Sequence, residues 1–208
     1  MSGLGDQLAQ GIAKLGVSVE KTAQTRLLDY LALLEKWNRS YNLTAVRQPP
    51  QMISKHLLDC LAILPYVSAH FALDVGSGAG LPGIPLAIAR PQTQVTLLDS
   101  SQKKTTFLRQ ALIQLGLANV TVICERAETW RPLRKFDLVI SRAFSNLLDF
   151  IALAGRWCAA DGILAAMKGA YPRQELAHLP SGFRLERTIP LTVPDLNEAR
   201  HLILIRPE

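Results

Sequence analysis

Apolar residues recur with helical spacing over the first third of the chain. Three such stripes cover about residues 4–15, 20–38 and 52–64, and Pro65 follows the last of them. Recurrence at every third or fourth position is the signature of an amphipathic helix. Residues 41–50, which end in Pro49-Pro50, interrupt the pattern and predict a loop. We therefore expect residues 1–70 to form a helical N-terminal extension packed on the rest of the chain.

Beyond residue 70, short apolar runs alternate with helical stripes. The runs predict strands at 71–75, 94–99, 120–124, 136–141 and 163–168, and the stripes predict helices at 81–90, 101–116 and 145–158, with a weaker one at 172–178. Such alternation is typical of an α/β unit with a parallel sheet covered on both faces. Two final runs, at about 183–191 and 201–206, have no helix between them and predict an antiparallel hairpin. We expect a seven-stranded, mostly parallel sheet in residues 71–208, forming one compact unit with the extension.

The first strand is followed by three glycines at every second position: Gly76, Gly78 and Gly80. Glycine tolerates positive φ and lets a ligand approach bare backbone, and the helix that follows would present free N–H groups to it. The spacing over residues 78–83 fits the dinucleotide fingerprint. The stretch that begins at Asp74 fits the first motif of S-adenosylmethionine (SAM) methyltransferases equally well. Asp99, at the end of the next strand, would bind ribose hydroxyls of either ligand, so both cofactors stay open.

The fourth strand is followed by Ser141-Arg142-Ala143-Phe144, at the point where chemistry would take place beside a methyl donor. Enzymes that methylate exocyclic amino groups often have an Asn/Asp-Pro-Pro-aromatic turn here, which this chain lacks. No cysteine lies in a nucleophile motif either, so covalent catalysis is not supported. An acceptor that is already nucleophilic remains, such as guanine N7, whose lone pair carries no proton. No catalytic base is then assigned. Arg142 is the candidate positioning residue, for a phosphate, the guanine edge or the carboxylate of SAM.

The formal net charge of +6 favours an anionic partner such as nucleic acid. Residues 37–47 bring aromatic, amide and cationic side chains together, which fits either packing or contact with single-stranded RNA. Glu128, after the third strand, is a candidate for the adenine amino group. The residues expected to bind RNA are Arg47, Arg142, Lys168 and Arg200.

The three cysteines are scattered, and no CxxC spacing occurs, so the sequence supports neither a zinc site nor a disulfide framework. Reduced thiols and a cytoplasmic location fit this usage. Residues 1–10 lack the pattern of a signal peptide, and no uncharged apolar run reaches the length of a membrane span. We expect no metal, no membrane and no obligate protein partner.

Taken together, the motifs resemble the RsmG (GidB) family of bacterial 16S rRNA methyltransferases. The matching stretches run from about residue 27 to 205 in the family's order: Lys36-Trp37-Asn38, Tyr41-Asn42-Leu43-Thr44, His56-Leu57-Leu58-Asp59, Asp74 through Pro85, Leu97-Leu98-Asp99-Ser100, Lys103, Phe107-Leu108, Phe136-Asp137, Ser141-Arg142-Ala143-Phe144, Lys168-Gly169 and Arg200-His201-Leu202. The combination is specific to the family, although each short motif alone is not.

The resemblance implies a class I, Rossmann-like SAM-dependent methyltransferase that modifies N7 of one guanosine, at position 527 of 16S rRNA. Its partner would be the small ribosomal subunit or an assembly intermediate. The resemblance places SAM against Gly76, Leu81, Ala127, Glu128 and Arg142. With the residues of the glycine turn and the next strand end, the expected cofactor-binding set is Asp74, Gly76, Gly78, Gly80, Leu81, Asp99, Ala127, Glu128 and Arg142.

Two other classes of protein compete with this interpretation. An NAD-dependent oxidoreductase would use the same glycine spacing, but the chain offers no second domain with a convincing catalytic His or Tyr. A non-catalytic RNA-binding module would keep the fold and bind SAM without transferring a methyl group. Binding of NADH instead of SAM would favour the first alternative, and SAM binding without transfer would favour the second.

Overall fold

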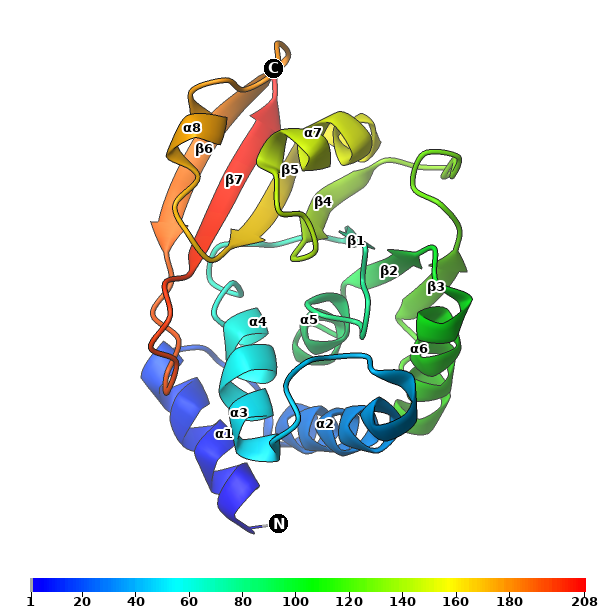
Figure 1. Cartoon of the computed structure of the whole chain (residues 1–208), viewed down its shortest axis with the longest axis vertical. Helices are drawn as coiled ribbons and strands as arrows, with labels where there is room; N and C mark the ends of the chain where they lie inside the picture. Colours follow the sequence, from blue (N-terminus) through cyan, green and yellow to red (C-terminus); the bar gives the residue numbers. More distant parts are fainter. Residues whose placement is uncertain (1) are drawn as a thin grey trace.

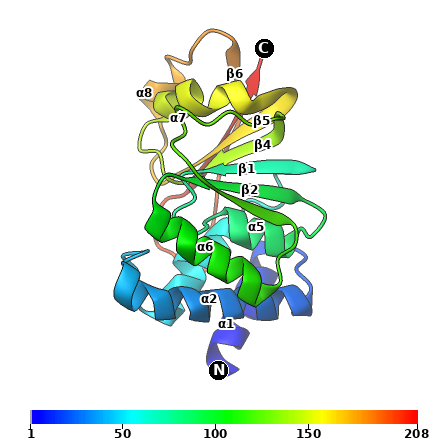
Figure 2. The same cartoon turned by 90° about the vertical axis from the view of Figure 1, so that its right-hand side faces the viewer.

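The computed structural model describes residues 2–208, so Met1 of the expected extension lies outside the described residues. The extension is helical, as predicted, and its elements lie on one side of the sheet (Figure 1, Figure 2). They are α1 (Ser2–Leu15), α2 (Lys21–Tyr41), α3 (Pro49–Met52), a π-helical turn η1 (Ile53–Leu58) and α4 (Asp59–Leu61). The last three form one continuous helical segment. No helix of the described chain has the length and apolar character needed to cross a membrane.

Seven strands form one sheet in the order β3-β2-β1-β4-β5-β7-β6. Their bounds are β1 (Phe71–Val75), β2 (Gln94–Asp99), β3 (Val120–Cys124), β4 (Phe136–Ser141), β5 (Cys158–Lys168), β6 (Phe183–Pro190) and β7 (His201–Pro207). The first five are parallel, whereas β7 runs antiparallel to both β5 and β6. This confirms the predicted mostly parallel sheet that ends in an antiparallel hairpin. It differs from the two-halved sheet of a dinucleotide-binding domain.

Helices cover the two faces of the sheet unequally. On one face lie α5 (Gly83–Ala89) and α6 (Gln102–Leu115), with α2 behind them, whereas α7 (Leu147–Ala154) covers β4 and β5 on the other face (Figure 2). A short helix, α8 (Arg173–Leu176), lies near α7. No helix occurs in the described segment between β3 and β4, which leaves part of the second face beside β1, β2 and β3 without a helical cover.

The extension and the sheet share one hydrophobic core. Leu8 and Leu27 of the extension belong to the same buried cluster as Leu97 and Leu108 of the α/β unit. Tyr30 of α2 is fully buried, and its hydroxyl donates a hydrogen bond of 2.7 Å to the carbonyl of Ala79 in the glycine turn. The extension therefore packs directly beneath the turn that the sequence singles out.

Helix and strand boundaries differ from the expected ones around residue 155. The helix expected to run to residue 158 ends at Ala154, a 3-10 turn (Gly155–Trp157) follows, and β5 begins at Cys158 instead of residue 163. At this boundary the absence of a side chain at Gly155 lets the Phe183 ring of β6 pack closely, since a Cβ there would lie 2.5 Å from the ring. The first part of β5 pairs with β4 through Phe136 and Cys158, with an irregularity before Leu138. The periodicity of apolar residues alone does not predict the pairing of Phe136 with Cys158.

Candidate functional site

The turn between β1 and α5 holds its three alternating glycines at positive φ, 71° for Gly76, 59° for Gly78 and 92° for Gly80. A Cβ at Gly80 would lie 2.5 Å from Ile84 and 2.9 Å from Leu108, so this glycine permits packing against two helices. The backbone N–H groups of the turn have partners within the chain. Gly76 N–H donates to Leu98 O and Gly80 N–H to Ser77 O. The turn therefore offers a bare backbone wall, and the expected free N–H groups are largely used internally.

Asp74 supports the turn from below. Its side chain is fully buried, and Oδ2 accepts a 2.9 Å hydrogen bond from the N–H of Gly83, the first residue of α5. A buried carboxylate near a helix N-terminus interacts favourably with the helix dipole. Burial nevertheless raises the pKa of Asp74 from its usual value of 3.8 to about 7, and Oδ1 has no partner among the described residues.

Asp99 lies across from the glycine turn at the carboxyl end of β2. Its Oδ2 accepts a hydrogen bond from Gly78 N–H at 2.9 Å, and its Oδ1 accepts one from Ser101 N–H at 2.8 Å. The Nζ atom of Lys104 is 3.8 Å from Oδ2. The carboxylate thus joins the turn to the start of α6. It lines a hollow, here called the strand-end hollow, together with Gly76, Lys104, Ala127, Glu128 and Phe144.

Two further hollows adjoin the strand-end hollow along the carboxyl ends of the strands. The glycine-turn hollow shares Gly76 and Lys104 with it and is also lined by Leu43, Thr44, Gly78, Leu81 and Arg142. The arginine hollow shares Arg142 with the glycine-turn hollow, and its other lining residues include Lys55, His56, Asp59, Lys168 and Arg200. We call the three together the cleft. It runs from a carboxylate at one end to a group of cations at the other.

A buried carboxylate anchors the cationic end of the cleft. The Oδ2 atom of Asp59 is 3.1 Å from Arg142 Nη1, and its Oδ1 is 3.3 Å from Arg200 Nε. The Arg142 Nη1 group also donates to the carbonyl of Lys55 at 3.0 Å. Burial raises the pKa of Asp59, and the two arginines oppose this rise. A solvent-exposed arginine after β4 would have no such partners. Arg142 is instead fixed in the cleft by Asp59 and the Lys55 carbonyl.

The cleft brings together most of the residues that the sequence indicated, and three lie outside its lining. Asp74 lies below the glycine turn, and Gly80 lies in the turn but on the side that packs against α5 and α6. Arg47 lies on the exposed loop beside the turn, where its Nη2 donates to Asn42 Oδ1 at 3.3 Å. Lys168 lines the arginine hollow, although its Nζ already pairs with Glu175 at 3.2 Å and contacts the Ser145 carbonyl.

Three lining residues that the extension supplies, Thr44, His56 and Asp59, carried no predicted role. Lys104 of α6 also lines the cleft, although no specific contact was predicted for it. His56 Nε2 lies 2.9 Å from Thr44 Oγ1, and burial lowers its pKa to about 4, which keeps the imidazole neutral near pH 7. One signal was present for Asp59, since a single carboxylate inside the apolar run of residues 57–64 must find a partner when buried.

The aromatic and amide side chains near residue 40 have structural partners. Trp37 packs on Tyr41 and Phe107, with ring centroids 4.8 Å and 5.7 Å apart. Asn38 is buried, and its Oδ1 accepts a 2.9 Å hydrogen bond from Thr44 N–H, which fixes the loop at the glycine-turn hollow. Of the two interpretations of this segment, packing describes these side chains.

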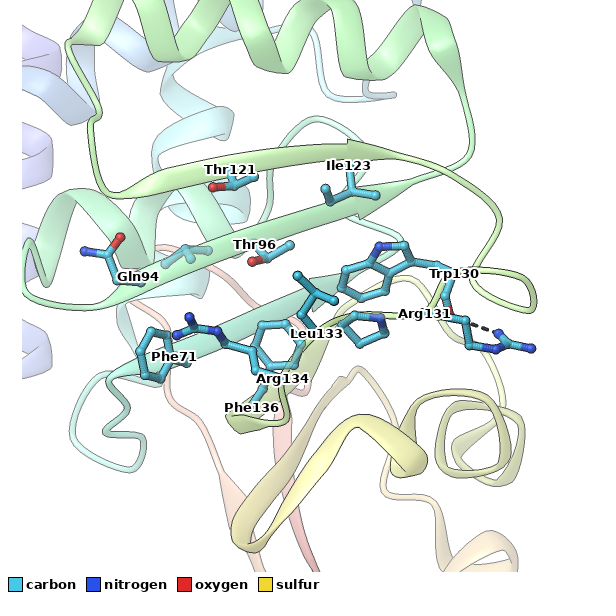
Figure 3. A pocket seen from close by; sticks show the side chains of 12 residues that line it. Phe71, Gln94, Thr96, Thr121, Ile123, Trp130, Arg131, Leu133, Arg134 and Phe136 are labelled. Atoms are coloured by element: carbon cyan, nitrogen blue, oxygen red, sulfur yellow. Dashed lines mark hydrogen bonds between the residues drawn. The ribbon is translucent and has the colours of Figure 1, made fainter.

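A separate hollow lies on the part of the sheet that no helix covers, and we call it the open-face hollow. Figure 3 shows Thr96, Thr121 and Ile123 on the strands, with Trp130 and Leu133 of the segment after β3 over them. Arginines lie at its border, and the guanidinium of Arg134 stacks 4.2 Å from the Phe71 ring centroid. None of the expected site residues lines it.

The strand order, the helices on both faces and the cleft at the carboxyl ends of the strands define the class I SAM-dependent methyltransferase fold. TrmN from Thermus thermophilus has the same fold, with a TM-score of 0.59 at 18% identity, over 82% of this chain and 53% of that one. A mutant of MtNAS in complex with S-adenosylmethionine superposes with a TM-score of 0.58 at 14% identity, over 88% of this chain and 75% of that one. Identities this low show the fold alone.

The family follows from the sequence comparisons. A model of the family described as rRNA small subunit methyltransferase G matches residues 23–203. The chain is 53% identical to the ribosomal RNA small subunit methyltransferase G of Nitrosospira multiformis, over 96% of both chains, and 50% identical to that of Nitrosococcus oceani, over 100% of this chain and 97% of the relative. The chain belongs to the rRNA small subunit methyltransferase G family, which confirms the resemblance drawn from the motifs.

Proposed function

We propose that this protein transfers a methyl group from SAM to N7 of one guanosine, position 527, in the 16S rRNA of the small ribosomal subunit or an assembly intermediate in the cytoplasm. Membership of the family supports the reaction class. The observation that carries the proposal is that Arg142 lines both the glycine-turn hollow and the arginine hollow. The glycine-turn hollow and the cationic arginine hollow thus meet at one side chain.

The proposed cofactor residues fit SAM chemically. Each oxygen of Asp99 accepts one backbone hydrogen bond, so each keeps a lone pair for a ribose hydroxyl. Ala127 and Glu128 would border the adenine, and Gly76, Gly78 and Leu81 would contact the remainder with Arg142. Asp74 and Gly80 would act indirectly, through the shape of the turn. When bound, SAM supplies an electrophilic methyl group on a sulfonium.

Guanine N7, the proposed methyl acceptor, requires correct positioning by the protein but no catalytic base. The lone pair of guanine N7 carries no proton, so in-line attack needs no general base, and the chain contributes by holding the guanine in line. The cationic end of the cleft suits this task, because guanidinium groups bind phosphate and carbonyl oxygens. We assign RNA contacts to Arg142, Lys168 and Arg200, with Arg47 on the adjoining loop. Residues 1–70 would form the extension and 71–208 the methyltransferase core.

Methyl transfer to defined small subunits tests the proposal. The purified protein is incubated with labelled SAM and small subunits from cells that lack their own copy of the enzyme. The rRNA is then cleaved with borohydride and aniline, which cut at N7-methylguanosine. Subunits from cells that keep the enzyme are the control and should accept no label, because their site is already modified.

A single new cut in 16S rRNA at position 527 is the expected result. Label without a cut would retain the methyltransferase and reject N7 as the acceptor. A cut elsewhere would reject the position. Absence of label on subunits and on naked rRNA, with SAM still bound, would reject the proposed reaction and favour the binding-module alternative.

A further inference from the structure

We infer that Asp59 is a positioning residue for the RNA acceptor, because its carboxylate holds Arg142 and Arg200 in a fixed pair at the arginine hollow. The inference rests on the proposed function and extends it to a residue with no assigned role. Asp59 is 1% exposed, and each of its oxygens faces a different guanidinium, at 3.1 Å and 3.3 Å. Neither arginine is fully buried, so their remaining N–H groups can reach a ligand.

The three residues come from distant parts of the chain. Asp59 lies in α4 of the extension, Arg142 follows β4, and Arg200 precedes β7. Two guanidinium groups at one carboxylate repel each other, and the negative charge between them offsets this repulsion. A single buried carboxylate without these partners would be strongly disfavoured. The carboxylate and the arginine pair therefore depend on each other.

Further contacts fix the pair from the outer side. Arg200 Nη2 donates to Glu198 at 2.9 Å, and Glu198 also pairs with Lys55 Nζ at 2.8 Å. The carbonyl of Lys55 in turn accepts the 3.0 Å hydrogen bond from Arg142. Asp59, Arg142, Lys55, Glu198 and Arg200 thus form a closed ring of contacts at the hollow. Such a ring restricts the rotamers of both arginines, which lowers the entropic cost of binding an anion.

The chemistry of N7 transfer limits what the arginines can bind. Arginine commonly pairs with the O6 and N7 atoms of guanine, but a donor on N7 would occupy the lone pair that must take the methyl group. The arginine pair must therefore bind another acceptor. A phosphate oxygen of the acceptor strand suits two guanidinium groups beside Lys168. Asp59 would then set the distance between the anchored phosphate and the methyl donor.

The test compares Asp59→Asn with Asp137→Asn as a matched control. Asp137 is also a carboxylate that ties segments together, since its Oδ2 accepts hydrogen bonds from His70 and Phe71 N–H, but it lies at the opposite ends of the strands. We expect Asp59→Asn to lower kcat/KM for small subunits at least 10-fold and to raise the Kd of SAM by a clearly smaller factor, because only one of the two arginines that Asp59 holds, Arg142, belongs to the proposed cofactor set. The control should change neither quantity by more than 2-fold.

A double variant separates positioning from a purely structural effect. Arg200→Lys keeps a charge beside Asp59 and loses the planar fork, so it should fold even if Asp59→Asn does not, and it should lower subunit affinity in filter binding. If Asp59 acts through the arginines, the kcat/KM of the Asp59→Asn/Arg200→Lys variant for small subunits should be no lower than that of the less active single variant. The inference would be overturned if the losses of kcat/KM in the two single variants multiplied in the double variant. It would also be overturned if SAM affinity and subunit affinity fell equally, or if Asp59→Asn and Arg200→Lys both kept a normal kcat/KM.

The wild-type arm reports on the proposed function separately. If wild-type protein transfers methyl groups to 16S rRNA and Asp59→Asn does so equally well, the role inferred for Asp59 is rejected and the proposed function stands. If wild-type protein transfers none, the proposed reaction falls, and filter binding of subunits by wild type, Asp59→Asn and Arg200→Lys still decides whether Asp59 governs RNA affinity.

Discussion

The cleft and the open-face hollow lie beside the same strands, yet only one has the character of a reaction site. The cleft follows the carboxyl ends of the strands and is lined by two carboxylates that are almost completely buried, Asp59 at 1% and Asp99 at 7% exposure, while Asp74, at 0%, lies beneath it. The open-face hollow is lined by apolar residues, threonines, a glutamine and arginines, with no carboxylate (Figure 3). Buried charge, rather than concavity, distinguishes the two.

The difference has an energetic basis. An apolar hollow with bordering arginines costs little to build, because its charges remain in water. A buried carboxylate must be compensated by hydrogen bonds or cations, and Asp99 and Asp59 each have such partners on separate elements. The contacts of Asp99 and Asp59 therefore join segments of the cleft that are distant in the sequence. Three predictions test this contrast.

The largest effect is expected for Asp99→Ala in the cleft, with Thr96→Ala as its control. Both residues lie on β2, but Thr96 lines the open-face hollow. Removing the carboxylate leaves the ribose hydroxyls and Gly78 N–H without an acceptor, at a cost of about 1–3 kcal/mol, which weakens SAM binding by about 5- to 150-fold. Titration calorimetry with SAM measures both proteins. Equal affinity in wild type and Asp99→Ala would refute the ribose role, and a comparable loss in Thr96→Ala would break the contrast.

A smaller effect concerns the pH dependence of stability at Asp74. Burial raises its folded-state pKa to about 7, above the usual 3.8, so the folded protein binds a proton more tightly than the unfolded chain. The contribution of this carboxyl to the free energy of unfolding is then fully present below about pH 4 and is lost as the pH rises through 7.

Asp74→Asn isolates that contribution. The amide oxygen can still accept from Gly83 N–H, and the side chain no longer titrates. Urea unfolding at pH 5 and pH 8 should show wild type losing stability relative to the variant as the pH rises. His56, whose lowered pKa has the opposite consequence, is common to both proteins and cancels in the difference. A difference that stays constant between the two pH values would contradict the raised pKa.

The fold was largely predictable because its signals are local. The glycine turn, the apolar strands and the final pair of strands without a helix each occupy a short stretch of sequence, and together they indicate a mostly parallel sheet that ends in an antiparallel hairpin. The start of β5 was not predictable in this way, because it is defined by the pairing of Cys158 with Phe136 of β4, which lies in a different part of the chain.

The site residues show the same difference between local and long-range signals. Gly76, Gly78 and Asp99, which line the cleft, could be proposed from the sequence because their motif is contiguous or lies at a strand end. Asp59 was not assigned a role, since its partners Arg142 and Arg200 lie more than 80 and 140 positions away and only the folded arrangement joins them. Asp74 was expected in the cofactor-binding set but lies below the turn, because spacing does not show which side of a loop a carboxylate faces.

The smallest effect is expected for Leu133→Ser in the open-face hollow. Leu133 is fully exposed although it borders this hollow, so replacing it removes little buried apolar area. The free energy of unfolding should change by no more than about 0.5 kcal/mol, and methyl transfer to small subunits should be unchanged. Leu81→Ser is the comparison, since Leu81 is 5% exposed and lines the glycine-turn hollow, and it should impair both properties. Chemical unfolding and the labelled-SAM assay measure the pair. Lower transfer by Leu133→Ser at unchanged stability would make the open-face hollow part of the working surface, because a fully exposed side chain can influence the reaction only through something that binds it.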